Sequence, residues 1–207
     1  MNFFAKFVII LSLCTLPLHF SNAQDIEEKH ENEKKIKPAV LPSRALNLLH
    51  PILENAKRIR YYKEFGKDTY FYEVKAIFKK EKLSIKFDQE GRLIDIEVLK
   101  KFENLPKEVQ ASVQQYLTVN FKKSRIKRTQ VQYNKQAAGG LETKNDHAYL
   151  KEFINSDLKT FTLKYEIEAE VIDAKKESAF YEFLFDANGK LEVVKKIIER
   201  ADDNILY

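Results

Sequence analysis

The sequence has few of the residues on which disulfides, metal sites and many active sites depend. Its 207 residues include one cysteine, one methionine, five glycines, five prolines and no tryptophan. The cysteine, Cys14, lies in an apolar run near the N-terminus, so removal of that run leaves no disulfide, no thiolate nucleophile and no thiolate metal site. A chain without cystines depends on its hydrophobic core, and its length is sufficient to bury one.

Motifs of catalysis and cofactor binding are also missing. The sequence contains no HExxH motif, no glycine-rich phosphate loop and no Gly-x-Ser-x-Gly elbow. Beyond the N-terminal run, the histidines His30, His50 and His147 lie far apart in the sequence, in surroundings that supply no further metal ligands. We therefore expect no catalytic residues, no cofactor and no metal site, and a protein that is not an enzyme.

Residues 1–23 have the features of a cleaved export signal. Lys6 precedes the apolar run 7–16, and small residues favour cleavage between Ala23 and Gln24. The run is too short to span a bilayer comfortably, so we expect no stable membrane insertion after cleavage; an uncleaved membrane anchor is the alternative. The predicted location is outside the cytoplasm, in the bacterial periplasm or the medium.

The remaining terminal segments and the charge balance say little about a partner. Residues 24–40 mix charges with few apolar side chains, which predicts a flexible lead segment, and 201–207 form a C-terminal tail.

The basic run Lys122–Arg128 could contact a polyanion. However, the chain has 31 acidic against 36 basic residues and is predicted to be exported, so we expect no nucleic-acid partner.

The apolar pattern predicts strands and helices in alternation. Apolar residues at every second position indicate strands at 59–65, 70–78, 83–87, 93–98, 161–171, 181–185 and 191–198. Helical spacing predicts a helix from Leu105 to Phe121, a short helix from Leu41 that Pro51 kinks or ends, and one that Asp146 caps. Glu166, Glu168 and Glu170 alternate with apolar residues on one strand, which predicts a solvated face.

Two stretches of this pattern resemble each other and a known family. Leu-Pro pairs at 41–42 and 105–106 precede helices, and Phe-Asp-x-x-Gly-x-Leu follows at 87–93 and 185–191. In this order the motifs resemble the PepSY-like domains, which are similar to the repeats of beta-lactamase-inhibitor proteins. The resemblance covers about residues 41–200, with an additional 134–160 region in the second copy.

The resemblance implies an α+β fold of two tandem units. Each unit would be a helix packed on an antiparallel sheet of about four strands. The expected boundaries are 41–104 for the first unit and 105–200 for the second, with an inserted loop around 134–160.

The resemblance also implies a binding or inhibitory module of the cell envelope. The expected partner is an unidentified protein or peptide, and inhibition or regulation of an envelope hydrolase is the sharpest form of this hypothesis. The alternative is a small-ligand or envelope-surface binding protein that uses the cleft between the two sheets. Because aromatic residues are favoured at interfaces, Tyr62, Phe71 and Tyr133 are the predicted partner-binding surface.

Overall fold

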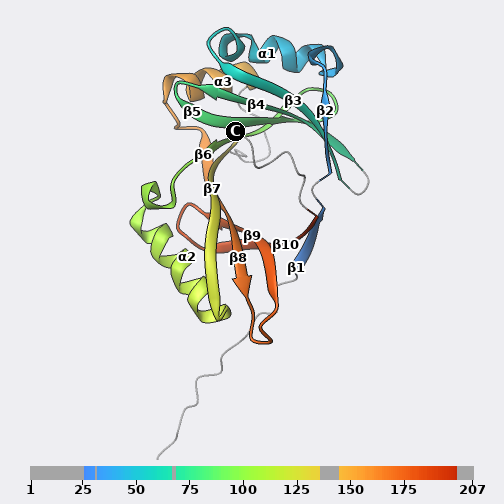
Figure 1. The fold of residues 1–207 in the computed structure, drawn as a ribbon. Helices are drawn as coiled ribbons and strands as arrows, with labels where there is room; N and C mark the ends of the chain where they lie inside the picture. Colours follow the sequence, from blue (N-terminus) through green and yellow to red (C-terminus); the bar gives the residue numbers. More distant parts are fainter. Residues whose placement is uncertain (1–25, 31, 67–68, 136–144, 200–207) are drawn as a thin grey trace, which may run out of the picture.

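A computed structural model describes residues 26–30, 32–66, 69–135 and 145–199. The predicted signal with its cleavage site at Ala23 and Gln24, and the tail 201–207, lie outside these residues. Within the described residues, ten strands form one sheet in the order β1-β10-β9-β8-β7-β6-β5-β4-β3-β2. Three α-helices lie on one face of that sheet (Figure 1).

The elements follow the predicted alternation closely. The strands are β1 (Ile26–His30), β2 (Glu33–Ile36), β3 (Lys57–Phe65), β4 (Tyr70–Phe78), β5 (Glu81–Phe87), β6 (Leu93–Leu99), β7 (Lys123–Lys135), β8 (Phe161–Ile172), β9 (Ser178–Asp186) and β10 (Leu191–Glu199). The helices are α1 (Ser43–Leu53), α2 (Lys107–Asn120) and α3 (Asp146–Asn155). Neighbouring strands pair antiparallel, apart from β1 and β10, which are parallel.

The prediction of two separate helix-on-sheet units is wrong. β6 pairs with β7 through Asp95–Leu99 and Gln130–Asn134, so the two halves of the chain share one sheet. In addition, α3, which lies in the region predicted as an inserted loop, packs on the core of the first half through Tyr149 and Leu150. The period-two pattern identified the strands, but it does not specify which strands pair.

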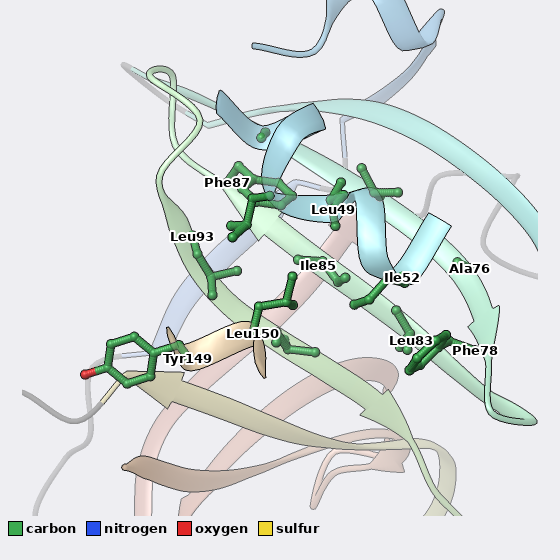
Figure 2. Close-up of a cluster of buried hydrophobic side chains, with 14 of the residues drawn as sticks. Leu49, Ile52, Ala76, Phe78, Leu83, Ile85, Phe87, Leu93, Tyr149 and Leu150 are labelled. Atoms are coloured by element: carbon green, nitrogen blue, oxygen red, sulfur yellow. The ribbon is translucent and has the colours of Figure 1, made fainter. Parts of the chain in front are cut away.

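Two hydrophobic clusters hold the helices on the sheet. The first lies between β4–β6 and the helices α1 and α3, and Figure 2 shows Leu49 and Ile52 of α1 facing the apolar side chains of these strands. The second lies beneath α2, where Val109 and Val113 meet the apolar face of β8 and β9. Tyr133 and Leu163 contact both clusters, so the cores are continuous across the middle of the sheet.

The two predicted Asp-x-x-Gly turns are confirmed and have the same hydrogen bonds. Asp88 Oδ1 accepts hydrogen bonds from the backbone N–H groups of residues 90 and 92, and Asp186 Oδ1 accepts them from residues 188 and 190. Gly91 and Gly189 have φ angles of 77° and 81°, which glycine adopts without strain. A Cβ atom at Gly189 would also lie 2.6 Å from Oγ of Ser112 in α2. This turn therefore packs so closely against α2 that a larger side chain would clash.

Two helix ends differ from their predictions. α1 does not end at Pro51 but continues to Leu53; the proline removes the backbone hydrogen bond that residue 51 would donate, and only two helical residues follow it. The N-cap of α3 is Asn145, whose side chain accepts a hydrogen bond from the backbone N–H of Ala148. Asp146 is instead buried, where it pairs with Arg44 and Lys135.

The charged segment 24–40 contradicts its prediction as a flexible lead. Its residues 26–30 form β1 along β10, and its residues 33–36 form β2 along β3, at the two opposite edges of the sheet. In Figure 1 this stretch, from here on the N-terminal segment (26–36), passes from the lower half of the sheet to the upper half. The sheet is therefore so strongly curved that one short segment reaches both of its edges.

Candidate binding face

The face of the sheet opposite the helices is polar, and much of it is buried. We call it the inner face. Register partners on neighbouring strands place polar side chains side by side across it. Its buried polar residues are Glu73, Lys75, Ser84, Asp95, Glu97, Gln130, Glu166, Glu168 and Glu182. Such a face is unusual, because buried charges require partners to offset the loss of hydration.

On the first half of the inner face, charges are paired across strands. Lys75 Nζ lies 2.9 Å from a carboxylate oxygen of Glu33 and 3.0 Å from one of Glu73. Ser84 donates a hydrogen bond to Glu73, and Lys86 Nζ lies 2.8 Å from Glu64. Glu33 belongs to β2, so this network also fastens one end of the N-terminal segment to the sheet.

On the second half, basic groups bind only some of the carboxylates. Arg128 donates a hydrogen bond of 3.2 Å to Glu168, and Lys195 lies 3.2 Å from Glu182. Lys29 of β1 also donates a hydrogen bond to Glu182, which fastens the other end of the N-terminal segment. Among the residues that the structure describes, the hydrogen-bond donors to Glu97 are neutral: the side-chain amides of Gln130 at 2.7 Å and Gln132 at 3.1 Å.

Burial divides the carboxyl groups of the inner face into two kinds. Burial, reinforced by Glu97, raises the pKa of Asp95 to about 8. Burial and the nearby Glu182 likewise raise the pKa of Glu166 well above its ordinary value. For Glu182, burial acts in the same direction but is outweighed by Lys29 and Lys195, which lower its pKa. At neutral pH the inner face therefore holds ionised and protonated carboxyls side by side.

A cavity of about 120 Å³ lies at the inner face beneath the N-terminal segment. Its lining joins Lys29 and Glu33 of the segment to Glu97, Gln130 and Glu166 of the sheet. This volume accommodates a few water molecules but no peptide. Access of a larger molecule to the inner face therefore requires the N-terminal segment to move.

The predicted partner-binding residues do not share one surface. Tyr62 lies on the inner face, where it is 4% exposed and its ring is 4.8 Å from the ammonium of Lys75. Phe71 is a half-buried residue of the same face, near Lys86. Tyr133 points to the opposite face and packs edge-on against Phe153.

The sequence analysis missed the polar residues that form the candidate site. It placed Glu166 and Glu168 on a solvated face, and this prediction is wrong, since they are 9% and 6% exposed. Alternation of charged and apolar residues on β4, β6 and β8 was the available signal. It identified a polar face, but the curvature that buries that face is a property of the assembled sheet.

An apolar pocket of about 220 Å³ lies on the other side of the sheet, beside α3. Its lining is mainly apolar and includes Phe78, Leu83, Tyr133, Phe153 and Leu158, but Lys79 and the ion pair of Glu81 with Lys100 also contribute to it. The expected cleft between two sheets does not exist, because the strands of the described residues form one sheet. The apolar pocket beside α3 is therefore the candidate small-molecule site instead of that cleft.

Other kinds of site were sought in the described part of the chain. No group of three or more histidine, cysteine, aspartate or glutamate side chains there could hold a metal ion. No helix there is long and apolar enough to cross a membrane. The basic run Lys122–Arg128 is partly neutralised, because Lys127 pairs with Glu170 and Arg128 with Glu168.

Comparison with known proteins identifies the fold. No family model and no curated protein matches the sequence. Among solved structures, a DUF2874 family protein from Bacteroides ovatus has a TM-score of 0.51 at 8% identity, over 78% of this chain and 92% of that one. A BLIP-like protein from Bacteroides fragilis gives 0.48 at 14% identity, over 79% and 92%. A DUF2874 family protein from Bacteroides uniformis gives 0.49 at 8%, over 75% and 88%. At these identities the similarity shows a shared fold with the first of these proteins and nothing of function.

Proposed function

We propose that this protein is an exported, non-enzymatic binding module that recognises a segment of another protein on the inner face of its sheet. One observation carries the proposal. A broad polar face, with its charges already ordered, is covered by a short segment of the chain rather than by a hydrophobic layer.

β1, part of the N-terminal segment that covers the inner face, is weakly attached to the sheet. In β1, four of five residues are exposed and only Lys29 is half-buried, and Ile26, its one apolar residue, is 56% exposed. Its attachment includes a five-residue backbone ladder with β10 and the ion pair between Lys29 and Glu182. Because little apolar area is buried, displacement of β1 costs little of the hydrophobic stabilisation that holds the rest of the fold.

The proposal is tested with variants that release or lock β1 at position 28. Glu28 is exposed and lies opposite the exposed Lys196 of β10. Glu28→Pro removes a backbone donor and disrupts the ladder, whereas Glu28→Ala is the matched control. The double variant Glu28→Cys/Lys196→Cys locks the segment, because neighbouring strands about 4.8 Å apart suit a disulfide.

All four proteins, without residues 1–23, are used as bait in envelope extracts. The proposal predicts a protein partner captured most by the Glu28→Pro variant, less by the parent and Glu28→Ala, and not by the locked variant until it is reduced. Capture that is equal in the released and locked states would show that partners do not use the inner face. Inhibition of an envelope hydrolase is then measured on the captured partner.

A second function, small-ligand binding, is favoured only by the apolar pocket beside α3. Leu83 lines this pocket and is buried. Leu83→Met keeps the volume of the side chain, whereas Leu83→Phe fills part of the pocket. If a small apolar ligand binds there, its stabilising effect in thermal unfolding persists in the first variant and disappears in the second.

A further inference from the structure

Among the described residues, three neighbouring carboxyl groups on the inner face have no basic group in direct contact, although Lys86 acts on the charge of Asp95 from the adjacent strand, and Lys29 and Arg128 act on that of Glu166. Within the described residues, Asp95, Glu97 and Glu166 form no ion pair, and Glu166 forms no hydrogen bond either. Gln130 lies between Glu97, to which it donates a hydrogen bond, and Glu166, its register partner on β8. We call Asp95, Glu97, Gln130 and Glu166 the acceptor cluster.

The acceptor cluster contains acceptor atoms that no donor reaches. Oδ1 of Asp95 and Oε1 of Gln130 are buried and have no hydrogen-bond partner among the described residues. Gln130 is 3% exposed and lines the cavity beneath the N-terminal segment, so this unpaired acceptor belongs to a residue at the space that an incoming group would occupy. A buried acceptor without a donor destabilises the folded state, so the cluster is incomplete.

The missing group is a cationic donor. The cluster is rich in oxygen acceptors and poor in N–H donors, and Glu97 contributes to raising the pKa of both Asp95 and Glu166. A lysine or arginine side chain supplies several donors and a positive charge, and hydrogen bonds to charged groups are stronger than neutral ones. The chain itself already uses this chemistry next to the cluster, where Lys29 of β1 reaches Glu182.

We propose that the acceptor cluster recognises a basic side chain on an extended segment of a partner protein, and that this segment replaces β1 beside β10. The inference rests on the proposed function for its surface, and it adds the chemistry of the partner and the competition with the chain's own strand.

Strand geometry specifies the segment further. The side chains of a strand alternate between its two faces, so basic residues at every second position would face the cluster and Glu182 together. The intervening residues would point away from the inner face, as Glu28 does opposite Lys196. The backbone of the segment gains the ladder that β1 now forms with β10, which is the strand-addition mode of peptide recognition.

The test uses two labelled heptapeptides, one of alternating valine and lysine and one of alternating valine and glutamate. Their affinities for the position-28 variants are measured by fluorescence anisotropy at low and at physiological salt. The Glu28→Pro variant is expected to bind the lysine peptide at least about tenfold more tightly than the glutamate peptide, with a preference that weakens as salt rises. The locked variant is expected to bind neither peptide until it is reduced.

A substitution in the cluster separates recognition from general charge attraction. Glu166→Gln, in the Glu28→Pro background, keeps the shape of the side chain but cannot ionise, so it cannot become the carboxylate that an incoming cation would favour. It should weaken binding of the lysine peptide by at least about tenfold, which is close to the smallest contribution of one charge-assisted hydrogen bond. Glu177→Gln, which removes an exposed charge away from the inner face, should leave the affinity unchanged.

The outcomes distinguish this inference from the proposed function. Equal affinity for both peptides, tighter binding of the glutamate peptide, or equal loss in the Glu166→Gln and Glu177→Gln variants would overturn the inference. If extracts also yield a partner captured only by the released protein, the proposed function survives with a partner of different chemistry. If the lysine peptide binds as expected but no protein is captured, the recognition chemistry holds and the proposed function fails.

Discussion

Replacement of Asp95 by asparagine should stabilise the protein at alkaline pH. At acidic pH its stabilising effect should be much smaller. Asp95 is buried on the inner face, between Glu97 on its own strand and Lys86 opposite it on β5. The groups that act on its charge are Glu97, Lys86, Glu73 and Glu64, and three of these four are carboxylates. Asparagine imitates the protonated carboxyl in shape and in lack of charge, but it cannot ionise.

The magnitude follows from the pKa. Burial and Glu97 raise the pKa of Asp95 from an ordinary 3.8 to about 8 in the folded protein. The folded state therefore holds the proton more tightly than the unfolded state, and its stability falls as pH rises from about 4 to about 8. At about 1.36 kcal/mol per pKa unit, ionised Asp95 costs up to about 6 kcal/mol above pH 8. Gln132 and Lys86 can reorient towards the charge and reduce this cost. We therefore expect Asp95→Asn to raise the free energy of unfolding above pH 8 by about 2–4 kcal/mol.

The assay is urea unfolding followed by far-ultraviolet circular dichroism, since the chain has no tryptophan. The free energies of unfolding of the parent, Asp95→Asn and the exposed control Asp157→Asn are compared at pH 5 and pH 9. The free energy of unfolding of Asp95→Asn minus that of the parent should grow by about 2 kcal/mol or more from pH 5 to pH 9. For the control, the same difference should not change with pH. A difference that is independent of pH, or a variant less stable than the parent at pH 9, would refute the reasoning.

Two further predictions concern the rest of the fold. Lys75→Met should lower the free energy of unfolding by about 3–5 kcal/mol, because it leaves the buried Glu73 and the half-buried Glu33 without their common cation. The exposed control Lys80→Met should change it by less than about 0.5 kcal/mol, and a similar effect of both would contradict the pairing. Gly189→Ala should cost about 2–4 kcal/mol, because its φ of 81° is strained for alanine and the new Cβ meets Ser112. Gly66→Ala, where the nearest atoms are 3.5 Å away, should cost little in the same unfolding measurement, and equal costs at both sites would contradict the steric argument.

The sequence predicted the helices and most strands because their signals are local. Alternation of apolar residues in Tyr72, Val74 and Ala76 follows directly from the pleat of a strand, and Gly91 marks a turn that needs a positive φ. The pairing of β6 with β7 has no such local signal. It arises because the long strand β7 extends far enough to join both halves of the chain, and only the assembled sheet shows this.

The candidate site could not be predicted from the sequence, for a related reason. Charged residues at alternate positions, such as Glu166 and Glu168, predict a polar face but not its burial. Burial depends on the curvature of the whole sheet and on the N-terminal segment, which contains almost no apolar residues and is held at the edges by backbone pairing and ion pairs. Apolar periodicity, the main signal used for strands, is absent from such a segment.

The path of the N-terminal segment has a consequence for the order in which the protein folds. β1 and β2 are neighbours in sequence, yet β1 can pair only with β10, one of the last elements to be made. Contacts between distant parts of a chain close slowly, because the intervening chain loses conformational freedom. The hairpins β4–β5 and β9–β10 are local and form early by the same reasoning. We therefore expect newly made molecules to pass through a stage in which the sheet has formed and its inner face is open, so that a partner present at that moment would bind the face without competition from β1.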